Sequence, residues 1–217
     1  LAYWQSGRSD EAFHLWKSNV IESMYHGISP GNFQQLSHYD AYRSELYRDF
    51  ADPIGIASRT LTEGLFGYLP KLLDGYVSIK PGFPADWDFA ELTTPHWSYN
   101  FKKENNTNKY TIKTKYASPI ALHLEIPVYK TIVKRVLING KEVSWTLKEE
   151  SIGNPIILFK TEKSQDFHIE VEYAGSDIIF DTSVVQHAFS DEFKINLPAG
   201  FSVIEVFDPQ KIVKNYI

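Results

Sequence analysis

Cysteine is absent from the 217 residues, which excludes disulfide bonds, thiolate metal ligands and a cysteine nucleophile. No apolar run approaches the roughly 18 residues that a membrane-spanning helix needs, so no membrane span is predicted. The seven histidines are scattered without a ligand spacing such as HExxH, so no metal site is predicted. The sequence also lacks an excess of positive charge, and its net charge of −5 argues against a nucleic-acid partner.

Aromatic side chains, by contrast, are abundant, with 14 Phe, 13 Tyr and 5 Trp. Such residues are typical of β-sheet cores, and their flat apolar faces also suit the apolar faces of sugar rings. We expect packing in the core to be the role of most of them. The composition therefore allows a carbohydrate-binding surface without requiring one.

Helical patterns dominate residues 1–80. Apolar side chains recur at helical spacing behind a serine cap, which predicts a helix over 10–26. The dipeptide Asp52-Pro53 predicts the start of a second helix, which runs to about Leu69. Residues 1–4 have the character of the last turn of a helix, so we expect this chain to be the C-terminal part of a larger protein.

The pattern changes to strands in the second half of the chain. Residues 81–95 are rich in proline and predict an extended linker. Apolar and polar residues alternate from residue 96 onward, and Asn139-Gly140 predicts a type I′ hairpin turn. We interpret 96–217 as an antiparallel β-sandwich domain. After the hairpins, further strands are predicted at 155–160, 167–173, 178–182, 192–197 and 202–207.

The densest group of ionisable side chains lies in and just after a long polar connection over residues 28–50. Loops of this length inside a compact domain are often functional. Glycoside hydrolysis needs two carboxyl groups flanking the scissile bond, and Glu45 is our first candidate, with Asp40 second. A network of ion pairs that ties the loop to the helices is an equally good explanation. The residues in the group are His38, Tyr39, Asp40, Tyr42, Arg43, Glu45, Tyr47, Arg48, Asp49, Asp52, Arg59 and Glu63.

Structural roles explain several members of this group. Asp52 precedes a proline and is best explained as a helix cap. Glu63 lies within the predicted helix, one turn after Arg59, and we expect the two to pair. Glu45 has no such role, which is why it is preferred as a catalytic residue.

Two segments resemble known glycosidases. The segment YRSELYRDFADPIG, beginning at Tyr42, resembles an uncharacterised family of glycoside-hydrolase-like proteins from gut bacteria. The segment SRTLTEGLFGYLPKLLDGYVSIKPGFPADWDFAEL, beginning at Ser58, resembles the end of the (α/α)6 barrel of six-hairpin glycosidases, including bacterial α-L-rhamnosidases. The resemblance covers roughly residues 1–100. The tryptophan–glutamate signature of the rhamnosidases is missing here, since Ser44 precedes Glu45.

The resemblance implies a fold and an activity. The implied fold class is α+β multidomain, with the last helices of an (α/α)6 toroid over 1–80, the linker, and then the β-sandwich. The implied activity is inverting hydrolysis of a polysaccharide or oligosaccharide, without a cofactor, in the periplasm or outside the cell. Glu45 would be the general base, and the general acid would lie in an N-terminal part of the same polypeptide. Candidate sugar-binding residues are His38, Tyr39, Tyr42, Arg43 and Trp87.

Two alternatives remain open from the sequence. A polysaccharide lyase on a related helical toroid would use His38 or a tyrosine as base and Arg43 to neutralise a uronate. A non-catalytic carbohydrate-binding or structural module would need no carboxylate pair.

Overall fold

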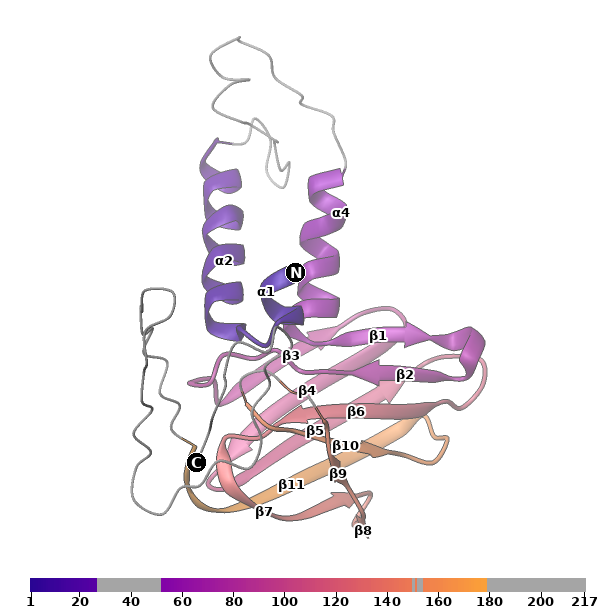
Figure 1. Cartoon of the computed structure of the whole chain (residues 1–217). Helices are drawn as coiled ribbons and strands as arrows, with labels where there is room; N and C mark the ends of the chain where they lie inside the picture. Colours follow the sequence, from indigo (N-terminus) through magenta and orange to yellow (C-terminus); the bar gives the residue numbers. More distant parts are fainter. Residues whose placement is uncertain (27–51, 150, 152–153, 179–217) are drawn as a thin grey trace, which may run out of the picture. The chain divides into compact units, whose positions relative to one another are not determined.

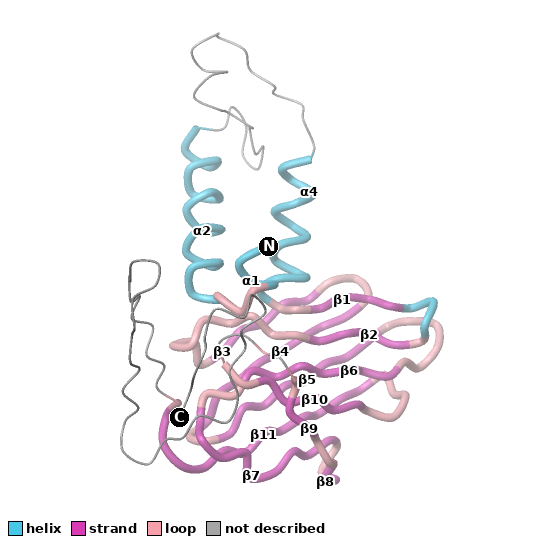
Figure 2. The backbone as a smooth tube through the Cα atoms, viewed as in Figure 1, coloured by secondary structure: helices cyan, strands magenta, loops and turns pink. Residues whose placement is uncertain are grey.

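The computed structural model describes residues 1–26, 52–149, 151 and 154–178, and two β-sheets form the largest part of its regular structure (Figures 1 and 2). The expected fold class is wrong, because the described residues contain no helical toroid. Strands begin at Tyr68, inside the stretch that the sequence pattern assigned to helix. The described helical elements are α1 (Ala2–Gln5), α2 (Ser9–His26), α4 (Asp52–Arg59), the π-helix η1 (Thr60–Leu65) and the 3₁₀ turn η2 (Leu72–Asp74).

The first sheet is mixed in strand direction. Its neighbouring strands are antiparallel except for β2 and β6, which run parallel, with Tyr76 opposite Ala121. Pro70 is tolerated in β1 because this strand lies at the edge of the sheet, where a missing N–H breaks no ladder. The strand order is β1 (Tyr68–Lys71), β2 (Tyr76–Ile79), β6 (Ala121–Pro127), β10 (Ile156–Lys160) and β9 (Thr146–Leu147).

The second sheet is antiparallel throughout its described strands. The predicted hairpin turn at Asn139-Gly140 is confirmed, since both residues have the positive φ of a type I′ turn, 49° and 77°. Predicted strands beyond residue 178 lie outside the described residues. The strand order is β3 (Phe89–Thr93), β4 (Trp97–Glu104), β5 (Thr107–Thr114), β11 (Asp166–Asp177), β7 (Lys130–Ile138) and β8 (Lys141–Val143).

One hydrophobic core lies between the sheets and explains the alternation in the sequence. Along β4, the side chains of Trp97, Tyr99 and Phe101 are buried, while Asn100 and Lys102 are exposed. Buried side chains of both sheets belong to the same cluster. Because side chains alternate between the faces of a strand, each sheet contributes one apolar face to this core.

Single side chains attach the helices to each other and to the loop that follows β2. The Trp4 indole is 5% exposed, and its Nε1 donates a 2.7 Å hydrogen bond to the carbonyl oxygen of Gly82. The Trp16 indole of α2 donates to the carbonyl oxygen of Ala57 in α4 at 3.3 Å. None of the helices in the described part of the chain is long and apolar enough to cross a membrane.

The second predicted helix is shorter than expected. It runs as α4 and then η1, which ends at Leu65, and the chain turns at Gly67 with φ 62°. The carbonyl oxygen of Gly67 accepts a 2.9 Å hydrogen bond from the backbone N–H of Lys80. The turn therefore directs the chain from the helices into the first sheet.

Candidate binding pocket

Most of the predicted site residues lie outside the described residues. This holds for both candidate carboxylates, Glu45 and Asp40, and for His38, Tyr39, Tyr42 and Arg43. Trp87 is described, half-buried, and lines a pocket. The expected pair of Arg59 and Glu63 is confirmed, with Nε and Oε2 2.8 Å apart.

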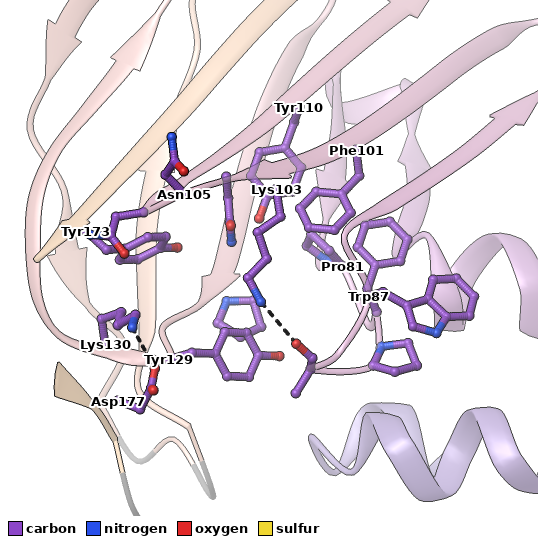
Figure 3. A pocket seen from close by; sticks show the side chains of 16 residues that line it. Pro81, Trp87, Phe101, Lys103, Asn105, Tyr110, Tyr129, Lys130, Tyr173 and Asp177 are labelled. Carbon is purple, nitrogen blue, oxygen red and sulfur yellow. Dashed lines mark hydrogen bonds and ion pairs between the residues drawn. The ribbon is translucent and has the colours of Figure 1, made fainter.

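The pocket lies where the loop over 81–87 meets the turn between β4 and β5 and the first residue of β7 (Figure 3). It holds about 620 Å³ of empty space, including the part open to solvent. The lining contains six aromatic residues, three prolines, three asparagines, two lysines, one aspartate and one alanine. Apolar rings together with a small number of polar groups are typical of ligand sites.

Aromatic rings form one wall of the pocket. Phe83 stacks on Phe101 with ring centroids 4.7 Å apart, and Phe101 stacks on Tyr110 at 5.3 Å. Trp87 lies at the margin of this group, where Phe13 of α2 meets its ring edge-to-face at 4.7 Å. These contacts fix the indole in place, so Trp87 presents a rigid aromatic surface at low entropic cost.

Two tyrosines lie on the opposite side, beside the start of β7 and the end of β11 (Figure 3). Burial raises the pKa of Tyr129 to about 12, and the negative charge of Asp10 adds to this shift. Burial also raises the pKa of Tyr173, whose hydroxyl stays protonated and able to donate. The nearby side chain of Asn108 opposes this effect and lowers the pKa of Tyr173. The two side chains do not, however, have the geometry of a hydrogen bond.

The Tyr173 hydroxyl is the unusual feature of the pocket. The residue is 7% exposed, and among the described residues its hydroxyl has no hydrogen-bond partner. An unpartnered buried hydroxyl destabilises a fold by about 1–3 kcal/mol relative to a satisfied one. A ligand group that reached this hydroxyl would restore the missing bond.

Charged side chains surround the pocket. The ammonium of Lys130 lies 2.8 Å from the carboxylate of Asp177. This hydrogen bond lowers the pKa of Asp177, so the carboxylate stays ionised at neutral pH. The ammonium of Lys103 extends to the 81–87 loop and donates to the carbonyl oxygen of Ala85 at 3.2 Å (Figure 3).

This arrangement is suited to binding rather than to proton transfer. A general acid or base works best when its pKa lies near the working pH. Asp177, the carboxylate among the described lining residues, has a lowered pKa and an ion-pair partner. The described residues contain no cluster of three or more His, Asp or Glu side chains that would hold a metal ion.

Trp87, predicted as a sugar-binding residue, lines this pocket, whereas the tyrosines and Lys103 were not predicted. Tyr129 precedes β7 and Tyr173 lies in β11, more than forty positions later, and no local spacing brings them together. The one usable signal was the polar turn at Asn105-Asn106, which places amide side chains at the end of a hairpin rich in aromatic residues.

Comparisons with known proteins give little guidance. No family model and no curated protein matches the chain. A solved structure of a GH127 β-L-arabinofuranosidase from Geobacillus stearothermophilus T6 aligns with 15% identity and a TM-score of 0.31. The alignment covers 59% of this chain and 20% of that structure. At this TM-score the likeness supports no argument about fold or function, so function has to be argued from the residues.

Proposed function

We propose that this protein binds carbohydrate in the pocket beside Trp87, as the sugar-binding part of a glycoside hydrolase. The observation that carries the proposal is the combination of fixed aromatic faces with a buried, unpartnered Tyr173 hydroxyl. The hydrolase part rests on the resemblance of the segments that begin at Tyr42 and Ser58 to glycosidases.

The chemistry of the lining fits a sugar ring. A pyranose has apolar C–H faces, which suit the rings of Trp87 and Tyr129. Its rim of hydroxyl groups needs partners that both donate and accept hydrogen bonds, and asparagine amides do both. Asn105 and Asn106 are exposed at the pocket, and the Tyr173 hydroxyl adds a deeper partner.

Catalysis is proposed from the sequence alone. Glu45 would act as the general base of an inverting hydrolysis, with Asp40 as the second candidate carboxylate. The non-catalytic alternative predicts that binding in the pocket survives without any turnover.

The sharpest test of sugar binding is Tyr173→Phe, which removes the hydroxyl and keeps the ring. Because that hydroxyl has no partner in the described residues, the substitution should raise the free energy of unfolding by about 1 kcal/mol. Affinity for a bound oligosaccharide, measured by titration calorimetry on the full chain, should fall by about tenfold. A purely structural residue would not separate stability from binding in this way.

Tyr99→Phe is the matched control. The Tyr99 hydroxyl is also buried and without a partner among the described residues, but Tyr99 lies in the core and does not line the pocket. Its removal should raise stability by a similar amount and leave sugar affinity unchanged. Equal sugar affinity in both variants and in the wild type would contradict the proposed site.

A further inference from the structure

The charges that line the pocket do not balance, and this imbalance points to the kind of sugar that it takes. Two ammonium groups, those of Lys103 and Lys130, face the pocket, together with one carboxylate, that of Asp177. Asp177 is paired with Lys130 at 2.8 Å. Among the described residues, Lys103 makes no ion pair, and its ammonium donates a hydrogen bond to the carbonyl oxygen of Ala85.

We infer that the pocket takes an anionic sugar with one negative charge on a ring, such as a uronate, and that Lys103 pairs with the charge of the ring in the pocket. The inference rests on the proposed function and names its substrate class. Lysine binds an anion as a point charge on a flexible stem, so a carboxylate or a sulfate ester on the sugar meets the same requirement.

Lys103 keeps the capacity to bind an anion. An ammonium group has three N–H donors, and the contact with Ala85 at 3.2 Å uses one of them. The other two remain for a ligand oxygen. The bond to Ala85 also directs the side chain across the pocket toward the 81–87 loop, so the charge is already positioned when a ligand arrives (Figure 3).

A carboxylate beside the 81–87 loop is already engaged. Asp10, in the first turn of α2, accepts a 3.2 Å hydrogen bond from the backbone N–H of Ala85 through its Oδ1. It is not among the residues that line the pocket. Among the described lining residues, Lys103 is therefore the cation without an ion-pair partner, and one carboxylate or sulfate group of a ligand would pair with it.

The remaining lining matches the rest of such a ligand. Trp87 and Tyr129 offer aromatic surface for the ring, and the asparagine amides offer partners for its hydroxyl groups. Charge-assisted hydrogen bonds are stronger than neutral ones, so the ammonium would supply much of the selectivity.

The test uses the full chain and matched pairs of trisaccharides. Trigalacturonate, triglucuronate and trimannuronate, with one carboxylate on each ring, are each compared with the neutral trisaccharide of the same sugar and linkage. Sulfated galactose, compared with galactose, provides a sulfate ester as the second source of the charge. Binding is measured by titration calorimetry at low and high salt. The variants are Lys103→Gln and, as the control, Lys102→Gln.

Lys102 is a close control because it is the neighbouring residue on β4. Successive side chains of a strand point to opposite faces, and Lys102 does not line the pocket. Its ammonium lies 2.6 Å from the carboxylate of Glu104 on the exposed face. Both variants remove one positive charge, so a nonspecific effect of net charge would appear equally in each.

The expected result is that at least one charged probe binds about tenfold more tightly than its neutral partner. That preference should weaken with salt, vanish in Lys103→Gln and persist in Lys102→Gln. Tighter binding of sulfated galactose than of any uronate would assign the charge to a sulfate ester.

Two results would overturn the inference in distinguishable ways. If neutral trisaccharides bind as tightly as charged ones, or if Lys103→Gln keeps the preference, the inference fails and the proposed sugar binding stands. If no probe of either kind binds, the inference and the proposed function fail together.

Discussion

Gly67 is the residue on which the path of the chain from helix to sheet depends. It has φ 62°, a conformation that disfavours every residue with a Cβ atom. A Cβ atom here would also collide with the backbone of Lys80, the residue whose N–H bonds to the Gly67 carbonyl oxygen. Glycine is therefore required at this position for two separate reasons.

Gly67→Ala should lower the free energy of unfolding by about 3 kcal/mol, from backbone strain and overpacking together. Gly140→Ala isolates the first effect, because Gly140 has φ 77° but its added Cβ would have open space. That control should lose only about 1 kcal/mol, the effect of the left-handed backbone. Urea unfolding measures both, and equal losses would show that the contact with Lys80 does not matter.

Residue types in the sequence were enough to predict one residue of the candidate pocket, but not the others. Trp87, in the predicted extended linker, was a candidate sugar-binding residue, and it lines the pocket. Tyr173 and Lys103 carry no signal in the sequence, because their importance comes from what surrounds them. Segments distant in the sequence come together in the fold and determine these surroundings. Among the described residues, they leave the Tyr173 hydroxyl without a hydrogen-bond partner and the Lys103 ammonium without an ion-pair partner.

At the scale of elements, long strands were predictable and short ones were not. β4 and β5 each have eight residues, long enough for the alternation of apolar and polar side chains to be recognised. β1 and β2 have four residues each, and Pro70 within β1 suggested the end of a helix. These two segments form strands because β2 pairs with β6. That pairing is a tertiary interaction, which cannot be predicted from the local sequence pattern.

The hairpin of β4 and β5 has a charge arrangement that makes it sensitive to acid. Lys102 and Lys109 lie opposite each other on the two strands, where like charges repel. Glu104 lies between them, 2.6 Å from one ammonium and 2.7 Å from the other. Hydrogen bonds from both lysines, together with their positive charges, lower the pKa of Glu104 from 4.5 to about 2.

The hairpin should therefore loosen as the pH falls. Because the folded pKa is below the unfolded one, the stabilisation is complete above about pH 4.5 and is lost as the pH falls through about 2. The hydrogen-exchange protection factors of the amides next to the turn, which correct for the intrinsic pH dependence of exchange, should fall over this window in the wild type. Glu104→Gln should flatten the dependence, and salt should reduce it, since all three groups are exposed to solvent. A carboxyl that titrates near 4.5 in an NMR experiment would contradict the predicted interaction.

At the scale of the whole molecule, the resemblance to six-hairpin glycosidases led to the wrong fold class. The helical patterns were read correctly as helices over α2 and α4, but a few helices do not define a toroid. The described chain turns into a sheet at Tyr68, and its first two strands join a sheet completed far downstream. Helix content near one end of a chain cannot predict which strands the following residues will join.

The proposed catalysis is tested by removing the candidate base. Glu45→Gln in the full-length protein should abolish turnover of a sugar that the pocket binds, while leaving the melting temperature and the affinity nearly unchanged. Glu63→Gln is the control, because Glu63 pairs with Arg59 on a described helix and has a structural role. Normal turnover after Glu45→Gln would rule out this residue as the base, and ultraviolet-absorbing products would indicate a lyase instead of a hydrolase.

The parallel pairing of β2 with β6 also constrains the order in which the chain can fold during synthesis. β1 and β2 leave the ribosome well before β6 has been made, yet β6 is the strand that connects them to the rest of the sheet. Val77 and Ile79, fully buried in the finished protein, must stay uncovered during that interval. Apolar strands that stay exposed during synthesis are prone to aggregation. A chaperone that binds nascent chains should therefore increase the yield of folded protein.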